Sequence, residues 1–455
     1  MRVRGQGAMA LVFTGAVVLA AVAADRSGVA TPAPGPSPVA SSTSWICPHG
    51  GGAGIEGAIV LMNPGTEPAD VRITSIGEGR PAEPVEATVA PGHQLVRSVP
   101  ATDDGASTLV EAFGAWVGAS WRIVSEDPGG LGAEPCLPEA ATTWWAMDPG
   151  TPQGDLASLI VANPFSTDAV VDVALFAADR DPIRDAEWTD LPLPAMRSVA
   201  LRVNGKVVGE EAVLAEVVAE VGRVAVASLV MGRGGGIRSA VASSTLSGSW
   251  NFPVGGGTGQ TTLLVGMPAQ EGTGFGVSLL TREPVQDFGG LTDAELPGAA
   301  AHAYPGSVAG PSGVALEVRG EGMVAAALRA EGRSIDDGAT AGAPSPAATW
   351  LVPSTFLAEP WFPGLVIMNP GDRDAQVTLH HLATGGTPST DERTIAVPAG
   401  SAVAAPSEFL EAAPQAAIVV EAQGGKVVAL GSSASSGVQG YARYALVLGV
   451  PMPTG

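Results

Sequence analysis

The chain has 455 residues, of which 45% are hydrophobic and 15% are charged, and its net charge is −22. So acidic a surface excludes binding through nucleic-acid phosphates and disfavours an anionic membrane surface. The 61 glycines and 38 prolines argue against long helices, because both residue types break helical runs. The length also exceeds what one hydrophobic core fills, so the composition predicts an all-β protein with several domains.

The N-terminal segment has the features of an export signal. Two arginines precede an apolar run, and Ala21-Val22-Ala23 matches a small-residue cleavage site. We predict a signal peptide at residues 1–23, with an uncleaved N-terminal membrane anchor as the alternative. Residues 24–43 are rich in Pro, Ser and Ala, which indicates a linker. The signal predicts a secreted or cell-envelope protein.

The chain contains two cysteines, Cys47 and Cys136. An exported chain folds in an oxidising compartment, so we expect the two to form a structural disulfide. Closing a loop this long stabilises a fold by up to roughly 4–5 kcal/mol on the chain-entropy model. Neither thiol would then be free to act as a nucleophile, and no histidines are suitably spaced to complete a metal site.

A pattern of three elements recurs four times, at a period of roughly 100 residues. Each copy opens with a tryptophan that is soon followed by a proline, and these are Trp45, Trp145, Trp250 and Trp350. Late in each copy comes a glutamate within an apolar segment, at Glu111, Glu220, Glu317 and Glu421. One carboxylate in each copy makes no glycosidase pair, so these glutamates are expected at strand edges or turns.

The middle element of the pattern is an apolar run that ends in Asn-Pro. Three copies carry the pair, as Asn63-Pro64, Asn163-Pro164 and Asn369-Pro370, whereas the third copy ends in Met267-Pro268. Proline cannot donate to a sheet ladder, and asparagine can cap a turn with its side chain. The pair therefore predicts the end of a strand, and the ordered recurrence predicts four related domains.

Alternating apolar residues such as Val71 and Ile73 indicate strands throughout each copy. Roughly seven short strands in about 100 residues are typical of an immunoglobulin-like β-sandwich. We predict a tandem array of four such repeats, at residues 44–138, 139–245, 246–345 and 346–455. A four-bladed propeller is the rival, although each copy is about twice the usual blade length. The spacing in residues 210–220 of the second copy also fits a short helix, and residues 409–413 of the fourth copy fit a similar turn.

The Trp-x-x-Pro…Asn-Pro repeat resembles that of an uncharacterised family of actinobacterial secreted proteins, known only as a domain of unknown function. Similar repeats occur in arrays on surface proteins of other bacteria. The resemblance covers residues 44–452, and the third copy departs most from the pattern. It implies an exported β-repeat protein and brings no catalytic residues with it.

No motif supplies a converging catalytic or metal site. His49-Gly50-Gly51-Gly52 matches an oxyanion-hole motif, but the chain has no G-x-S-x-G nucleophile elbow. The histidines lack metal-ligand spacing, and His380 and His381 would point to opposite faces of a strand as a solvent-exposed pair. We therefore predict no catalytic residue, no metal and no cofactor.

The tryptophans give the only indication of a binding site. The four at the repeat position are expected in cores, but Trp116 and Trp121 lie outside it and, if exposed, could stack on sugars or a protein partner. The leading hypothesis is a non-catalytic scaffold or module that binds an envelope protein or a wall polymer. The alternatives are a carbohydrate-binding protein that uses exposed tryptophans and an enzyme whose site is built at a domain interface.

Overall fold

A computed structural model describes residues 42–125, 129–254, 260–281, 288–308, 312–331, 336–355, 361–385, 391–436 and 442–453. The predicted signal peptide and nearly all of the predicted linker lie outside these residues. Residues Ser41–Gly455 form one compact unit. Strands dominate it, which confirms the predicted all-β class. In the described part of the chain, no helix is both long and apolar enough for a membrane crossing.

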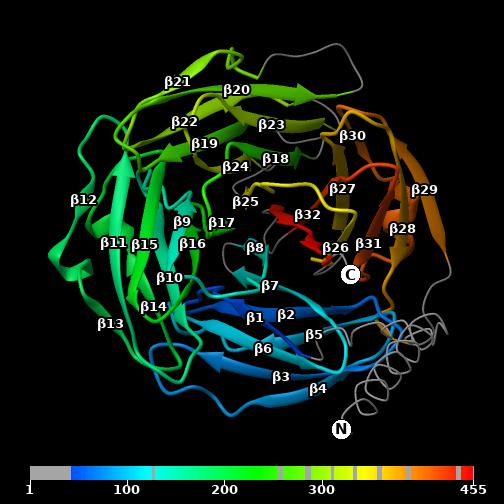
Figure 1. Ribbon diagram of the computed structural model, residues 1–455. Coiled ribbons are helices and arrows are strands. Elements are labelled where there is room, and N and C mark those ends of the chain that lie inside the picture. The colour runs from blue at the N-terminus through cyan, green and yellow to red at the C-terminus, as the bar shows by residue number, and fades with distance from the viewer. Residues whose placement is uncertain are drawn as a thin grey trace, which may run out of the picture. The chain divides into compact units, whose positions relative to one another are not determined.

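The first of four sandwiches pairs two sheets, with strand orders β1-β6-β3-β4 and β5-β2-β7-β8. It is drawn in blue and cyan in Figure 1. Its strands are β1 (Ser42–Cys47), β2 (Ile55–Asn63), β3 (Ala69–Ile76), β4 (Val85–Val89), β5 (His93–Val99), β6 (Ser107–Phe113), β7 (Gly118–Ser125) and β8 (Gly130–Pro135).

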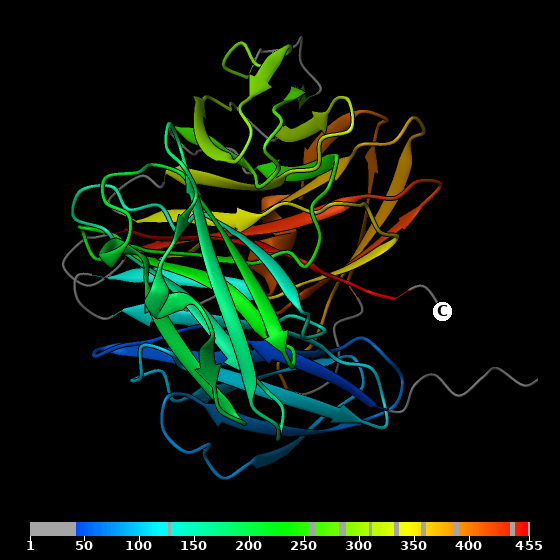
Figure 2. The same ribbon diagram turned by 60° about the vertical axis from the view of Figure 1, so that its left-hand side comes forward.

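The second sandwich repeats this order, as β12-β11-β15-β9 and β14-β10-β16-β17, with β13 also on β11. It faces the viewer, in green, in Figure 2. Its elements are β9 (Thr143–Met147), β10 (Leu156–Asn163), β11 (Ala169–Ala177), β12 (Ile183–Arg184), η1 (Ala186–Trp188), β13 (Leu191–Leu193), β14 (Arg197–Arg202), η2 (Val203–Gly205), β15 (Val213–Val221), β16 (Ala225–Met231) and β17 (Ile237–Val241).

The third sandwich has the orders β18-β23-β20-β21 and β22-β19-β24-β25. Its strands are β18 (Ser249–Val254), β19 (Thr261–Met267), β20 (Thr273–Leu280), β21 (Ala294–Leu296), β22 (Ala300–Gly306), β23 (Ser312–Val318), β24 (Ala325–Glu331) and β25 (Asp337–Ala341).

The fourth sandwich has the orders β29-β28-β31-β26-β34 and β30-β27-β32-β33, so one sheet gains a fifth strand. Its elements are β26 (Thr349–Val352), β27 (Trp361–Asn369), β28 (Ala375–His381), β29 (Glu392–Val397), β30 (Ser401–Ala404), α2 (Ser407–Ala412), β31 (Ile418–Gln423), β32 (Val428–Ser436), β33 (Ala442–Leu448) and β34 (Val450–Pro451).

The recurring strand order confirms an all-β array of sandwich repeats, and it also differs in detail from the predicted immunoglobulin arrangement. In the immunoglobulin fold, the first, second, fifth and fourth strands share a sheet. Here the first strand lies beside the sixth, and the second strand lies in the other sheet between the fifth and the seventh. We call the sheet with the first strand the outer sheet of each sandwich and the other one the inner sheet.

Inner and outer sheets differ in their burial patterns. In the outer strand β3, Val71 and Ile73 are buried and alternate with the exposed Asp70 and Arg72. The inner strand β2 is buried at nearly every position, because both of its faces are covered. Residues 210–220 do not form the helix that their spacing also fitted, since Val213–Val221 is the outer strand β15. Its first residues are buried on both faces, because Leu214 packs against the third sandwich and Val213 and Ala215 pack in the core of the second. By contrast, the turn predicted at residues 409–413 is largely the short helix α2.

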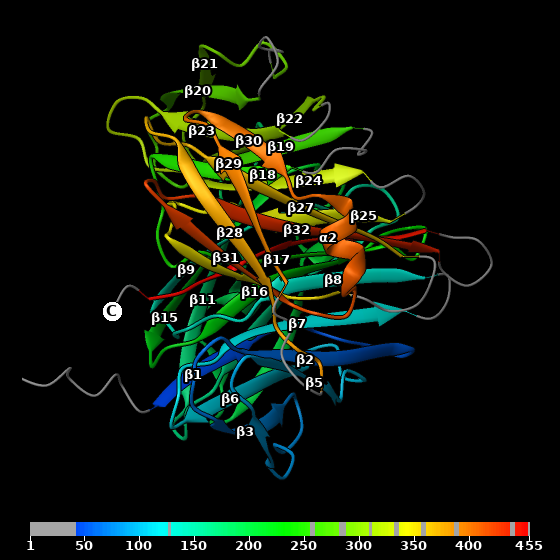
Figure 3. The same cartoon turned by 90° about the vertical axis from the view of Figure 1, so that its right-hand side faces the viewer.

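The last strand of each inner sheet, β8, β17, β25 or β33, lies at the centre of the compact unit, and we call these the central strands (Figure 1). Glycines let them approach closely, since a Cβ atom at Gly130 of β8 would lie 2.8 Å from the backbone nitrogen of Ile237 in β17. Similarly, a Cβ atom at Gly338 would lie 2.9 Å from the Leu446 nitrogen. In Figure 3, the inner strands β2, β7 and β8 run side by side across the view.

The sandwiches follow one another around the central strands, and the fourth returns to contact the first. The side-chain oxygen of Gln94 in the first sandwich accepts a hydrogen bond from the Ala417 N–H at 2.7 Å. The backbone N–H of Gln94 donates to the Ala383 carbonyl at 2.8 Å. The central strands β8 and β33 pack through Leu131, Ala133 and the side chains opposite them. The sandwiches are therefore arranged in a circle, as in the rival four-bladed propeller, but each unit is a two-sheet sandwich.

One buried carboxylate joins all four central strands. Asp336 directly precedes β25 and is 0% exposed. It accepts hydrogen bonds from the backbone N–H groups of Leu131 at 3.0 Å, Ile237 at 2.8 Å and Tyr444 at 2.7 Å, one from each of the other central strands. Burial raises the pKa of Asp336, and the three N–H groups oppose that rise.

The predicted repeat residues make equivalent contacts in the sandwiches, with one difference. Trp45, Trp250 and Trp350 are buried, and each donates its indole N–H to the carbonyl of a valine. In the second sandwich, Trp144 makes this bond, to Val224 at 2.6 Å, so Trp145 is not the equivalent residue. Trp144 and Trp145 are adjacent in the sequence, and the register in which β9 pairs with β15 determines which of them is the equivalent residue.

The asparagines of the Asn-Pro pairs tie the turn after the second strand to the rest of the sheet. Asn63 donates from Nδ2 to the carbonyls of Glu67 at 2.8 Å and Val89 at 3.0 Å, and its Oδ1 accepts from the Gly65 N–H at 3.0 Å. Asn163 and Asn369 make the same three kinds of bond. The prolines that follow, Pro64, Pro164 and Pro370, lie where the strand has ended, as does Pro268 of the third copy after Met267.

Candidate functional site

The most promising site is a cavity of about 760 Å³ at one end of the central strands, which we call the axial cavity. All four sandwiches contribute to it, through the segments that follow the central strands and through first strands of the outer sheets. Its lining includes Trp45, Trp116, Trp144 and Trp250, together with Pro135–Glu139, Val241–Thr245, Pro344 and Leu448–Pro453. The volume lies in the range of ordinary ligand sites, roughly 300–1,000 Å³.

The axial cavity is apolar and lacks positive charge. Among its described lining residues, Glu139 has the only ionisable side chain, which is exposed, and Cys136 is held in the disulfide. The half-buried Trp116 packs edge-on against Trp45, with 6.0 Å between the ring centroids and 73° between the ring planes. These features suit an uncharged or positively charged apolar ligand and disfavour an anion.

The structure separates the two tryptophans that were predicted as binding residues. Trp116 lines the axial cavity. Trp121 is 1% exposed and belongs to the core of the first sandwich, so its prediction as an exposed binding residue is wrong. The reason is that β7 lies between β2 and β8 in an inner sheet whose two faces are both covered.

First strands of the outer sheets turn one edge toward the axial cavity. In the first three sandwiches, a single residue of the segment that follows the central strand forms a β-bridge to this edge. The pairs are Ile46–Leu137, Trp145–Ser243 and Asn251–Ala343. In the fourth, the bridge extends into a strand, because β34 pairs with β26. The predicted disulfide Cys47–Cys136 is present and lies beside the first of these bridges.

A second cavity, of about 780 Å³, lies between the second and third sandwiches and contains a network of arginines and carboxylates. Arg238 lies 2.9 Å from Asp155 and 3.5 Å from Asp148. Arg329 contacts Asp148 as well, and Glu211 lies 3.5 Å from it. Burial lowers the pKa of Arg329, but the carboxylates of Asp148, Glu211 and Asp337 together outweigh that effect and raise it. Because carboxylates already engage both arginines, the network favours a structural role over anion binding.

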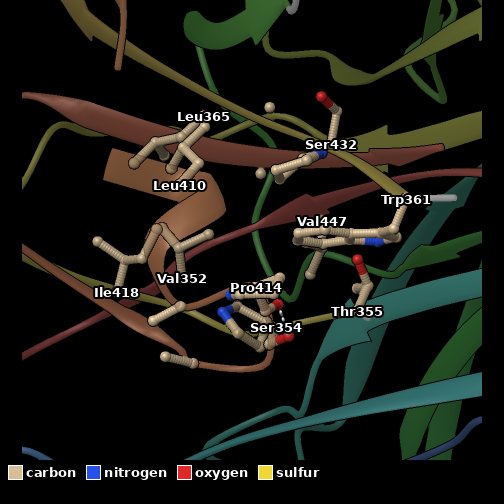
Figure 4. Close-up of a pocket in the computed structure, with 16 residues that line it drawn as sticks. Val352, Ser354, Thr355, Trp361, Leu365, Leu410, Pro414, Ile418, Ser432 and Val447 are labelled. Atoms are coloured by element: carbon tan, nitrogen blue, oxygen red, sulfur yellow. Dashed lines mark hydrogen bonds between the residues drawn. The ribbon is translucent and has the colours of Figure 1, made fainter. Parts of the chain in front are cut away.

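A third cavity is small and lies in the fourth sandwich, where Trp361 faces Ser354 and Thr355 (Figure 4). Its volume is about 30 Å³, room for a single water molecule. The Trp361 indole donates to the Ser433 hydroxyl at 2.8 Å, and the Ser354 hydroxyl donates to the Pro414 carbonyl at 3.0 Å. The cavity is too small for a ligand, so we assign Trp361 to packing.

The histidines of the sequence motifs do not form a site. His49 is buried, its pKa is lowered by burial to about 4, and its ring bonds to the Gly50 carbonyl and the Thr108 hydroxyl. His380 lies between two glutamates on the outer sheet of the fourth sandwich. His381 is 5% exposed and stacks on Phe409 at 4.0 Å, so the prediction of a solvent-exposed pair is wrong.

Glu134 is a buried carboxyl group in the central strand β8. It is 0% exposed, and neither of its oxygens has a hydrogen-bond partner among the described residues. Burial raises its pKa well above the ordinary value of 4.5, so the folded state holds this proton to a higher pH than the unfolded state does. The stability that Glu134 contributes at low pH is therefore lost as the pH rises through its folded-state pKa.

We expect Glu134→Gln to stabilise the protein at pH 7.5 by about 1–3 kcal/mol, because an amide needs no proton in order to be buried neutral. Near pH 3, where the carboxyl is largely neutral in both states, the two proteins should differ little. Urea unfolding at both pH values measures the difference in the free energy of unfolding. The pH-dependent contribution of His49 is the same in both proteins and therefore drops out of this difference. An equal difference at the two pH values would contradict the assignment.

Comparisons with known proteins add a family and no activity. A model described as a family of unknown function (DUF5719) matches residues 99–360, more than half of the chain. No curated protein matches the chain. Among solved structures, the chain is similar to the crystal structure of a tetra-tandem repeat in the extending region of a large adhesion protein. That match has 11% identity, covers 86% of this chain and 93% of the other, and has a TM-score of 0.09, too low to carry an argument.

Proposed function

The chain belongs to the DUF5719 family, whose function is unknown, and we propose that it is a non-catalytic, extracytoplasmic scaffold that binds an envelope component in its axial cavity. The observation that carries the proposal is the construction of this cavity. Residues of all four sandwiches line it, and the half-buried Trp116 lies among them. An apolar cavity of this size with few polar groups is the usual form of a binding site.

The lining supports binding over catalysis. Acid–base catalysis ordinarily uses a positioned pair of titratable groups, as the paired carboxylates of glycosidases illustrate. Among the described lining residues, Glu139 is the one carboxylate, and Cys136 is held in the disulfide. The other polar side chains of the lining are mainly hydroxyl groups, from Ser42, Thr43, Ser44, Ser243, Ser244 and Thr245.

Two features support an extracytoplasmic location. The sequence predicts an export signal at residues 1–23, and the disulfide Cys47–Cys136 is of the kind that persists in oxidising compartments. A protein or polymer of the cell envelope is accessible from that location. The acidic net charge of −22 further favours partners that are neutral or basic.

The test is retention of a component from the source cell's envelope extract on the immobilised chain. We expect Trp116→Ala to reduce retention at least about tenfold, because a half-buried tryptophan in a cavity is a typical binding hot spot. Phe362→Ala is the matched control, since Phe362 is 65% exposed and lies outside the axial cavity lining. Retention that is unchanged in Trp116→Ala, or no retention by the wild type, would overturn the proposal.

A further inference from the structure

Resting on this proposed function, we infer that the ligand of the axial cavity is an extended peptide segment of a partner protein, which adds as a strand to the free edge of β1. Strand addition of this kind derives its affinity from main-chain hydrogen bonds and its specificity from alternate side chains. The inference depends on a comparison between the first and fourth sandwiches, which have the same strand order but differ at this edge.

In the fourth sandwich, the edge of the first strand is already occupied. The chain's own segment β34 pairs antiparallel with β26, so that Val450 lies opposite Leu351 and Pro451 opposite Trp350. One residue further along, the Met452 N–H donates to the Thr349 carbonyl at 3.0 Å. The segment thereby extends the outer sheet beside the axial cavity, whose lining includes Val450, Pro451 and Met452.

In the first sandwich, the corresponding pairing starts but does not continue. Ile46 and Leu137 exchange two backbone hydrogen bonds, at 2.8 and 2.7 Å, in the place that Leu351 and Val450 occupy in the fourth sandwich. After Leu137 the chain passes through the exposed residues Pro138 and Glu139 and goes on to the second sandwich. The edge of β1 beyond Ile46 is thus left without a paired strand from the described residues.

The open part of this edge carries Ser44 and Ser42. Hydrogen-bonding directions alternate along a strand, so these two residues direct their N–H and C=O groups to the same side as Ile46. Both are exposed and line the axial cavity, and no described residue donates to or accepts from their backbone groups on this edge. An unpaired row of this kind is a template for another strand.

The third sandwich shows how the same edge can be closed. There Ser249 donates its N–H to the Ser247 hydroxyl at 3.1 Å, and that hydroxyl donates to the Ser249 carbonyl at 2.8 Å. Ser249 stands at the position of Ser44, one residue before the repeat tryptophan. Its backbone groups are therefore satisfied locally, whereas those of Ser44 remain available.

The lining of the cavity defines the chemistry of the peptide. The described lining residues include no basic side chain and one carboxylate, Glu139, so an acidic segment is disfavoured and a neutral or basic one is accepted. The segment Val450–Pro453 is apolar and uncharged, and its Met452 packs against the core of the first sandwich. We therefore expect the partner segment to be extended, apolar and free of acidic residues.

The probe is an end-capped, fluorescein-labelled peptide that copies residues 448–453, titrated with the full chain and followed by fluorescence anisotropy. Saturable binding is expected for the wild type. Ser44→Pro removes the outward N–H and should weaken binding by about tenfold or more. Ser44→Ala keeps the backbone and should bind within about twofold of the wild type. A peptide with aspartate in place of its methionine should bind more weakly than the original.

Hydrogen exchange on the wild type keeps the test independent of whether Ser44→Pro folds. Bound peptide should slow exchange of the Ser44 amide while the exposed Thr88 amide on the far edge of the same sheet is unaffected. Absence of peptide binding up to about 1 mM, or binding without protection of Ser44, would overturn strand addition.

The envelope experiment separates this inference from the proposed function. If Trp116→Ala loses the envelope component but Ser44→Pro retains it, strand addition fails and the binding function stands. If the retained component is a glycan and Ser44→Pro retains it as well as the wild type does, the proposal that the ligand is a peptide is also wrong. If the wild type retains nothing from the envelope, the proposed function fails, whatever the peptide does.

Discussion

Asp336→Ala is expected to destabilise the fold by about 3–6 kcal/mol, because it leaves three buried N–H groups without an acceptor and each costs about 1–3 kcal/mol. These N–H groups belong to Leu131, Ile237 and Tyr444, at the starts of three different central strands. Replacement therefore removes one hydrogen bond from each of these three strands at once. Urea unfolding followed by tryptophan fluorescence measures the change.

Asp336→Asn provides the graded control. The amide keeps one acceptor oxygen, but its nitrogen cannot accept from an N–H group, so we expect an intermediate loss. The order wild type, Asn, Ala in unfolding midpoint would follow the number of hydrogen bonds retained. An alanine variant as stable as the wild type would show that the central strands do not depend on this carboxylate.

The second large effect is expected at Asp148, where Asp148→Asn should cost about 3–5 kcal/mol, as for the loss of one partner from a buried ion pair. The side chains of Arg238 and Arg329 are 6% and 10% exposed, and both would lose this carboxylate. Asp148 has a φ of 71°, in the left-handed region that asparagine tolerates, so the backbone stays unstrained. The loss then reports on the charge and on the one acceptor oxygen that the amide lacks.

Asp104→Asn is the matched control for this experiment. It removes the exposed partner of Arg202, which lies 3.2 Å away, and pairs of this kind contribute at most about 1 kcal/mol. Added salt should weaken the exposed pair and leave the buried network nearly unchanged. Equal losses in the two variants would contradict the structural role assigned to the second cavity.

The sequence predicted those features that local chemistry determines. Asn63 caps a turn wherever an apolar strand ends in Asn-Pro, and two cysteines in an exported chain pair, so both features can be recognised without coordinates. Alternation likewise identified the strands. The choice between Trp144 and Trp145 required the pairing register, which a pattern of single tryptophans does not contain.

The circular arrangement could not be predicted in the same way, because the residues that produce it are not repeated. Gly130 and Asp336 each act at one position, so a search for recurring motifs passes over them. Trp121 shows the same difficulty, since strand periodicity does not reveal that a second layer covers an inner sheet. The candidate site depends on residues far apart in the chain, such as Ser44 and Met452, and of its described residues only Trp116 was predicted as a binding residue.

The contact between the fourth sandwich and the first has a consequence for how such a protein can evolve. In an open stack of repeats, unequal recombination can add or delete one copy, and the remaining interfaces survive. Here, loss of one copy would remove two interfaces, and an additional copy would have no central strand position to fill. Copy number is therefore under geometric selection, and divergence must proceed by substitution within each repeat, which is consistent with the individual edges that β1, β18 and β26 present.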